Sequence, residues 1–210
     1  VEHALRRLPG LRLGRTGRVF DALVPIVLEQ KVTSTEAHRG WSALVKRFGS
    51  PAPGPVPETG RPPLRVPPTA DEWRRIPSWA WHRCGVGPQR SRTIVRVAAV
   101  ADRLDAAGVA PSDVADARLR SLPGVGVWSS AEVRQRSHGD PDAVSVGDAN
   151  VPHHVAWVLA GERRASDERL IELLEPWRGH RHRVCDLLIR TTPRPPRRAS
   201  RAPIRDYRGM

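Results

Sequence analysis

The chain has 210 residues, 39% of them hydrophobic, which is enough for one sizeable domain or two small lobes with a buried core. Its formal net charge of +13 is spread along the whole sequence and favours a polyanionic partner. No apolar run reaches the roughly 18 residues of a membrane span and no secretory signal is present, so we expect a cytoplasmic protein.

Apolar residues at three- and four-residue steps predict two amphipathic helices before residue 50. The first spans Val19–Leu28, where Pro25 can bend it. The second spans Ala37–Phe48, follows a cap at Thr33 and ends at Gly49.

Residues 50–68 contain eight prolines and are predicted to form an extended surface insertion without regular structure. Thr69 and Glu72 then have the spacing of a capping box, which predicts the start of another helix. The apolar stripe from Ile94 to Leu104 predicts a further helix that ends at Gly108.

Downstream, the sequence predicts a helix over Ser112–Leu119, a tight LPGVG turn at 122–126 and a second helix over Val127–Ser137. Further patterns predict one helix over Asp148–Leu159 and one or two helices over Asp167–Ile189. No set of alternating strands is present, so the predicted fold class is all-α.

We expect one helical domain over residues 1–192, with a helix-hairpin-helix element at 113–137, and a basic disordered tail at 193–210. Outside the hairpin, His153 and His154 are expected to be polar surface residues. Six tryptophans are assigned to the core because they lie at helical spacing or beside apolar neighbours: Trp41, Trp73, Trp79, Trp81, Trp157 and Trp177.

The LPGVG hairpin is suited to binding a phosphate. Gly124 and Gly126 permit backbone angles that other residues avoid, and unpaired amides at the start of the following helix attract an anion. Such contacts position DNA without reading bases, and we assign them to Gly124, Val125, Gly126 and Val127.

The carbonyl oxygens of the same hairpin, at Arg120, Leu122 and Val125, are candidates to converge on a monovalent cation such as Na⁺ or K⁺. We expect no required cofactor. Cys84 and Cys185 are too few for a zinc site, an iron–sulfur cluster or a disulfide framework, and are interpreted as ordinary thiols.

The stretch LPGVGVWSSAEV, followed 24 residues after Gly124 by AVSVGDANV, resembles the helix-hairpin-helix DNA glycosylase superfamily. Within it, the branch most resembled is bacterial 3-methyladenine DNA glycosylase II. FDALVPIVLEQKVTSTEAHRGWSALVKRFG and EPWRGHRHRVCDLLIR are similar to the family's early helix pair and closing helix, so the resemblance covers roughly residues 8–190. Those relatives carry an extra N-terminal α/β domain that has no counterpart in this sequence.

The resemblance implies a two-lobed helical fold with a catalytic aspartate at the mouth of the cleft and the hairpin beside it; here that residue is Asp148. A carboxylate can stabilise the oxocarbenium-like sugar that forms as the base departs, and can assist its capture by water. The alternative reading is that Asp148 only caps the helix predicted to begin at Ala149.

Trp128 occupies the position at which some relatives carry a Schiff-base lysine, which implies base removal without strand cleavage. It also matches a tryptophan that stacks on alkylated bases in the resembled branch. Glu132, Ala149 and Asp186 stand where those relatives tend to be aromatic. Glu132 and Asp186 could add negative charge near a cationic base or accept hydrogen bonds from its edge, so the candidate base pocket is Trp128, Glu132 and Asp186. The alternative reading is a core tryptophan and two ordinary acidic residues on exposed helix faces.

Gln30 and Lys31 match the loop that fills the gap left when the target base is flipped out of the duplex. Lys31 replaces an apolar wedge of the resembled branch, and a solvated lysine is the alternative reading.

The sequence thus predicts a bacterial, monomeric DNA glycosylase of base excision repair that removes an alkylated base from double-stranded DNA. One alternative is a non-catalytic helix-hairpin-helix DNA-binding protein. Another is a glycosylase for deaminated, mismatched or oxidised bases. RNA binding is disfavoured because no stacking-sheet or KH-type motif is present.

Overall fold

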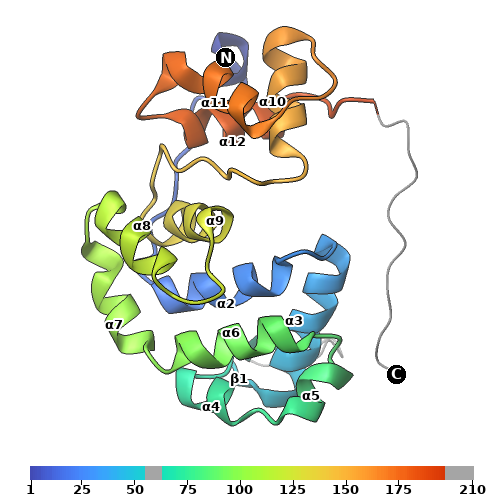
Figure 1. The fold of residues 1–210 in the computed structure, drawn as a ribbon, viewed down its shortest axis with the longest axis vertical. Coiled ribbons are helices and arrows are strands. Elements are labelled where there is room, and N and C mark those ends of the chain that lie inside the picture. The colour runs from blue at the N-terminus through green and yellow to red at the C-terminus, as the bar shows by residue number, and fades with distance from the viewer. Residues whose placement is uncertain (55–62, 197–210) are drawn as a thin grey trace. The chain divides into compact units, whose positions relative to one another are not determined.

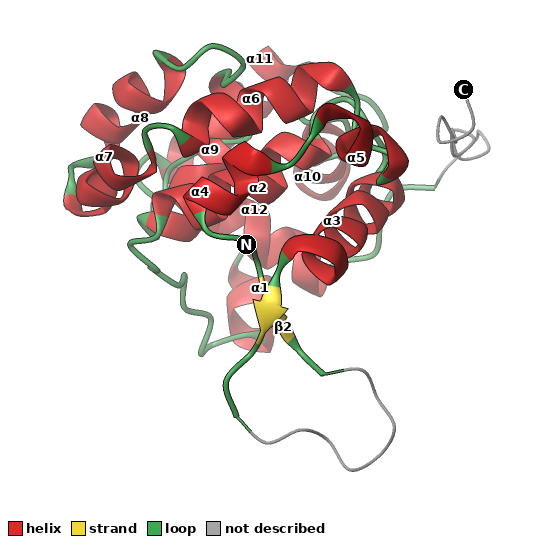
Figure 2. Cartoon of the chain, turned by 90° about the horizontal axis from the view of Figure 1, so that it is seen from below, coloured by secondary structure: helices red, strands yellow, loops and turns green. Residues whose placement is uncertain are grey.

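The computed structural model describes residues 1–54 and 63–196, and almost all of their regular structure is helical (Figures 1 and 2). This confirms the predicted all-α fold class. The chain divides into two compact units. In the described part, unit 1 comprises residues 1–22 and 105–196, and unit 2 comprises residues 23–104.

Unit 1 contains short and medium-length helices from both ends of the chain. They are α1 (Glu2–Arg7), the first residues of α2 (Val19–Glu29), the 3-10 helix η1 (Ala107–Val109), α8 (Ser112–Arg120), α9 (Val127–Ser137), α10 (Val151–Ala160), α11 (Asp167–Leu174), the 3-10 helix η2 (Glu175–Trp177) and α12 (Arg181–Thr191).

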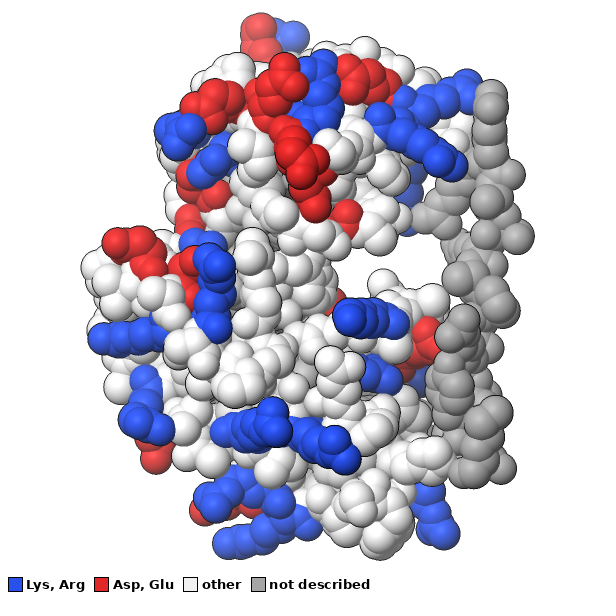
Figure 3. All heavy atoms as spheres, viewed as in Figure 1, with Lys and Arg blue, Asp and Glu red and all other residues white. Residues whose placement is uncertain are grey.

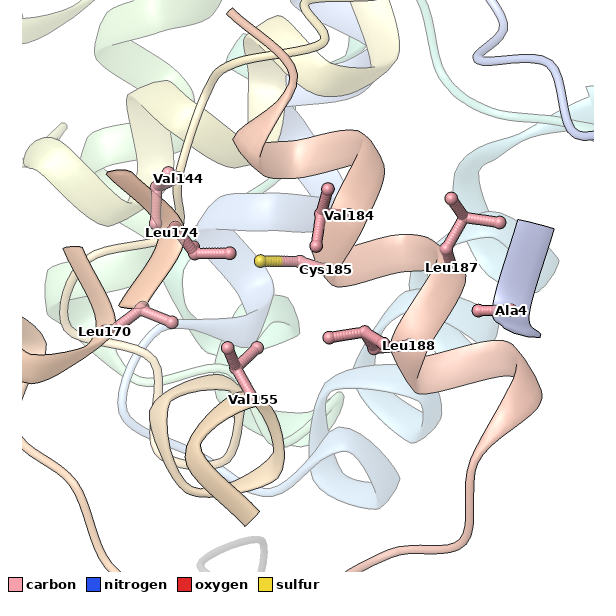
Figure 4. Close-up of a cluster of buried hydrophobic side chains, with 9 residues drawn as sticks. All are labelled: Ala4, Val144, Val155, Leu170, Leu174, Val184, Cys185, Leu187 and Leu188. Carbon is pink, nitrogen blue, oxygen red and sulfur yellow. The ribbon is translucent and has the colours of Figure 1, made fainter. Parts of the chain in front are cut away.

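The core of unit 1 forms where α12 packs against α1 and α10 (Figure 4). It includes one residue that lies outside the helices, Val144, which is only 8% exposed. Because burial of an aliphatic side chain stabilises by about 1.5–3 kcal/mol, Val144 fixes the loop that precedes α10 onto this core. The buried members are Ala4, Val144, Val155, Leu170, Leu174, Val184, Cys185, Leu187 and Leu188.

Unit 2 contains most of α2 and the elements up to α7. They are α3 (Ser34–Phe48), β1 (Ser50–Pro51), β2 (Arg65–Val66), α4 (Ala70–Arg75), α5 (Ser78–Arg83), α6 (Pro88–Ala98) and α7 (Ala101–Ala106), which ends just beyond the unit. The predicted capping box of Thr69 with Glu72 and the predicted cap at Thr33 are confirmed, and Thr33 also forms a capping box with Glu36.

Stacked tryptophans build part of the unit 2 core. The ring centroids of Trp41 and Trp73 are 6.1 Å apart, and those of Trp73 and Trp81 are 5.5 Å apart. The indole N–H of Trp81 donates to the Ile76 carbonyl, so its polar group is satisfied within the core. The core prediction is confirmed for Trp73 and Trp81 but wrong for Trp79, which is 51% exposed.

Several predicted helix boundaries need correction. The stripe from Ile94 to Leu104 is interrupted between Ala98 and Ala101, so it forms α6 and α7 instead of one helix. The pattern assigned to Asp148–Leu159 begins as a helix only at Val151, because Pro152 suits the first turn of a helix. By contrast, the prediction of one or two helices from Asp167 to Ile189 is confirmed: the segment forms two helices with η2 between them.

The proline-rich segment at 50–68 is not wholly irregular. Ser50 and Pro51 pair antiparallel with Val66 and Arg65, and the Ala52 amide donates to Leu64 O at 2.8 Å. Pro51 is tolerated because an edge strand does not need every N–H group for pairing. Residues 55–62 of the predicted insertion and 197–210 of the predicted tail lie outside the described residues.

His154 also differs from expectation. It is only 5% exposed, and its Nε2 lies 2.8 Å from the Thr192 hydroxyl. Burial lowers the pKa of His154, which favours the neutral imidazole. The adjacent His153 accepts the Ala165 amide through Nδ1, so both histidines hold unit 1 together.

Candidate active site

The hairpin between α8 and α9 is a tight turn. The Leu122 amide donates to Leu119 O at 3.1 Å, and the Val125 amide donates to Leu122 O at 3.0 Å. Gly124 has φ +94°, a conformation that a side chain would strain, so this glycine is required by the turn. Gly126 is different: its backbone is extended, and a Cβ there would meet open space.

The start of α9 is where the anion site is predicted. Gly126 is its N-cap, no side chain caps it, and Gly126 and Val127 are exposed. Val125 is only 5% exposed and its amide is used inside the turn, so its packing sets the hairpin's shape. Phosphate contact is therefore expected at Gly126 and Val127, through their amides.

Buried polar contacts join α8 to α9. The Ser130 hydroxyl donates to Asp116 at 2.6 Å, and the Arg134 guanidinium donates to Asp140 at 2.6 Å and to the Ser112 hydroxyl at 2.8 Å. Ser112 also donates to Asp140. These contacts fix the two helices of the hairpin and the loop after α9.

Asp148 lies in the loop before α10, and three hydrogen bonds orient its carboxylate. Oδ1 accepts the amides of Asn150 at 2.7 Å and Val151 at 2.9 Å, while Oδ2 accepts the Trp128 indole N–H at 3.2 Å. The side chain is half-buried. The N-cap of α10 is Asn150, not Asp148 as the alternative reading had it, but Asp148 accepts the first amide of this helix and also directs one oxygen toward α9. Holding the start of α10 is therefore compatible with catalysis.

The backbone beside Asp148 is itself held. Gly147 has φ +90°, and its amide donates to both carboxylate oxygens of Asp167, each at 3.0 Å. Two residues before Gly147, the Ser145 hydroxyl donates to Glu132 and accepts from the Gln135 amide group at 2.8 Å. Asp148 is thus fixed from both α9 and α11.

The two acidic residues assigned to the base pocket are engaged in ion pairs. Glu132 pairs with Arg136 at 2.7 Å and is 13% exposed, and Asp186 pairs with Arg190 at 2.6 Å and is 19% exposed. Burial lowers the pKa of His182, although the negative charges of Asp186 and Glu132 act to raise it. His182, in α12, is therefore near enough to both carboxylates for their charges to act on it, and no sequence motif marked it.

Neither cysteine is placed to act as a nucleophile. Both are buried and free, and burial raises the pKa of Cys185 to about 12. A thiol with this pKa is protonated at neutral pH. Cys185 contributes to the core instead (Figure 4).

Gln30 and Lys31 follow α2 in unit 2. Lys31 is exposed and has φ +56°, the one left-handed residue other than glycine in the described part of the chain. This conformation costs about 1–2 kcal/mol for a side-chain-bearing residue. The loop therefore holds an exposed lysine in a strained backbone, which sequence periodicity cannot reveal.

Replacing Lys31 by glycine is expected to stabilise the protein by about 0.5–1 kcal/mol, because relief of strain exceeds the added chain entropy. Urea unfolding followed by circular dichroism measures this change. Lys46→Gly is the matched control: Lys46 is exposed within α3, so glycine there should destabilise by about 0.5–1 kcal/mol. Equal destabilisation by both substitutions would contradict the strain at residue 31.

A depression of about 580 Å³ lies between α2 and α3 of unit 2. Pro25 and Glu29 line it from α2, and His38 and Trp41 from α3. No sequence motif marked this depression, because its residues face one another only after the two helices pack.

No group of three His, Cys, Asp or Glu side chains within residues 1–54 and 63–196 is placed to hold a metal ion. The carbonyls of Arg120, Leu122 and Val125 remain the predicted site for a monovalent cation, and that of Leu122 already accepts the Val125 amide. None of the described helices is long and apolar enough to cross a membrane.

The helical architecture, with the hairpin between α8 and α9, is the fold found in several solved DNA glycosylase structures. A 3-methyladenine DNA glycosylase from Archaeoglobus fulgidus matches with TM-score 0.75 and 20% identity over 90% of this chain and 64% of its own. No protein-family model and no curated protein matches the sequence.

Two further solved structures also share this fold. A Schizosaccharomyces pombe 3-methyladenine DNA glycosylase, bound to abasic DNA, has TM-score 0.70 and 14% identity over 89% of this chain and 88% of its own. A Clostridium acetobutylicum 8-oxoguanine glycosylase/lyase, bound to duplex DNA, has TM-score 0.69 and 13% identity over 90% and 65%. The chain spans less than two thirds of the Archaeoglobus and Clostridium proteins.

Proposed function

We propose that this chain is a monofunctional DNA glycosylase that hydrolyses the bond between a damaged base and its deoxyribose in duplex DNA. The observation that carries the proposal is the Asp148 carboxylate, fixed by two backbone amides and the Trp128 indole. A carboxylate held without freedom to reorient stabilises a developing positive charge best. It would act as the catalytic residue.

The proposed reaction needs no cofactor. The bond between C1′ and the base nitrogen breaks, and its electron pair leaves with the base. Asp148 stabilises the positive charge on the sugar, water adds to C1′, and the water proton passes to the carboxylate. The exposed amides of Gly126 and Val127 would hold a phosphate of the same strand, while Gln30 and Lys31 would fill the gap left by the flipped nucleotide.

Hydrolysis is favoured over Schiff-base chemistry by the distribution of lysines. The whole chain contains only Lys31 and Lys46, both in unit 2, and Trp128 occupies the α9 position beside Asp148. An indole nitrogen cannot form a Schiff base with the sugar, because this reaction needs an amine such as that of lysine. We therefore infer base removal that leaves the strand intact at an abasic site.

An alkylated purine is the substrate that we favour. An electron-rich indole beside the catalytic carboxylate suits a positively charged base, and two of the similar structures are named as 3-methyladenine glycosylases. The acidic residues Glu132 and Asp186 favour a second candidate, an oxidised or deaminated base with hydrogen-bond donors. The Clostridium structure, which is named as an 8-oxoguanine glycosylase/lyase, also supports this second candidate.

The test is incubation of the full chain with methylated duplex DNA, followed by assay of released bases and abasic sites. We expect release of a methylated purine, no strand cleavage and no covalent adduct after borohydride reduction. A panel of duplexes, each with one lesion, then separates the two candidate substrates. If no lesion is released, a non-catalytic DNA-binding protein is supported instead; a borohydride-trapped adduct would overturn the monofunctional mechanism.

A further inference from the structure

Two arginine side chains lie over the ring of an exposed tryptophan in unit 2. Trp79 lies in α5 and is 51% exposed. The Arg83 guanidinium, one turn further along α5, lies 5.2 Å from the Trp79 ring centroid, and that of Arg47, in the last turn of α3, lies 5.0 Å from it. The group Arg47–Trp79–Arg83 thus joins two helices at the surface.

No residue in the described part of the chain neutralises the charges of this group. Neither guanidinium forms a salt bridge or a hydrogen bond with any residue in 1–54 or 63–196. By contrast, Arg18, Arg134 and Arg169 each pair with carboxylates. The N–H groups of Arg47 and Arg83 therefore have hydrogen-bonding capacity for an acceptor from outside the chain.

The surroundings are also basic. Residues 23–104 contain 13 Lys and Arg against 6 Asp and Glu. In the space-filling view, unit 2 shows mainly basic side chains among uncharged ones, while unit 1 shows acidic and basic side chains together (Figure 3). Charge complementarity therefore favours a polyanion at the Arg47–Trp79–Arg83 group.

Helix termini explain only part of this arrangement. Arg47 and Arg83 both lie in last turns, where a cation interacts favourably with the helix dipole. That interaction does not require a tryptophan, and an exposed indole is an uncommon surface residue. Stacking on the indole restricts both guanidiniums, which lowers the entropy lost when they bind a ligand.

We propose that Arg47, Trp79 and Arg83 form a second DNA-binding site, separate from the hairpin, that holds phosphates of the nucleic-acid backbone. Each guanidinium donates to a phosphate oxygen, and the exposed part of the indole packs against deoxyribose. The site reads no bases, so it adds affinity for any DNA sequence.

The experiment measures binding of the full chain to an undamaged duplex at several salt concentrations. For R47Q/R83Q we expect weaker binding and a slope of log K against log salt that is smaller by about 2, one for each phosphate contact. W79A retains both charges but should also weaken binding and reduce the slope by about 1–2, because the arginines lose their support. Base release plays no part in this measurement, so it is independent of the proposed catalysis.

R92Q/R96Q is the matched control, because Arg92 and Arg96 are exposed one turn apart on α6 and removing them changes the charge equally. We expect it to change the slope by less than half as much, since neither arginine belongs to the Arg47–Trp79–Arg83 group and a charge that does not contact phosphate is screened by salt. An equal effect, or a W79A protein with unchanged slope, would overturn the proposal. Polyglutamate and competitor DNA of equal charge can also be compared for their ability to displace the bound duplex. If polyglutamate is as effective, the surface binds acidic polypeptides and the proposed DNA site is overturned.

Discussion

The Asp148→Asn protein is expected to bind damaged duplex DNA normally and to release bases at least about 10²–10³-fold more slowly, the effect of removing one preorganised electrostatic group. Asparagine is nearly the same size, and its carbonyl oxygen can still accept the amides of Asn150 and Val151. Its amide nitrogen, however, cannot accept the Trp128 indole N–H. The substitution thus removes the charge and keeps the helix cap.

Single-turnover base release and DNA binding, measured on the same preparation, check this expectation. Asp113→Asn is the matched control because Asp113 is exposed on α8 and undergoes the same chemical change. It should retain full activity. If Asp148→Asn retained base release within a few-fold of the original protein, Asp148 would be only a helix cap and the proposed mechanism would fail.

The part of the site that the sequence predicts best is the part fixed by local backbone geometry. Gly124 lies in a turn whose φ angle demands glycine, and the start of α9 follows directly from it. The distance in sequence to Asp148 could be read from a motif. The hydrogen bond from Trp128 could not, because it depends on the loop that Val144 anchors in the core.

Features that depend on tertiary packing could not be predicted from the sequence. Trp79 and Trp81 have the same apolar character, yet one is exposed beneath arginines and the other is buried, because they point to different sides of α5. His154 looks polar but its partner, Thr192, lies 38 residues away. Periodicity identifies a helix face, but it does not identify what packs against that face.

Arg134 is expected to matter most for stability, because it is the basic member of the contacts that hold the hairpin. Its side chain is 15% exposed and that of Asp140 is 7% exposed. Arg134→Met would leave the Asp140 carboxylate buried without its cation, so we expect a loss of about 3 kcal/mol in the free energy of unfolding. Urea unfolding followed by circular dichroism measures it.

Arg118→Met is the control because Arg118 is exposed on α8, and it should change stability by less than about 0.5 kcal/mol. The double variant Arg134→Met/Asp140→Asn tests the cause. Removing the stranded charge should restore part of the lost stability, since the two residues are in direct contact. If the two substitutions were simply additive, the pair would not be what holds α9 to the following loop, and the hairpin would owe its rigidity to apolar packing around Val125 instead.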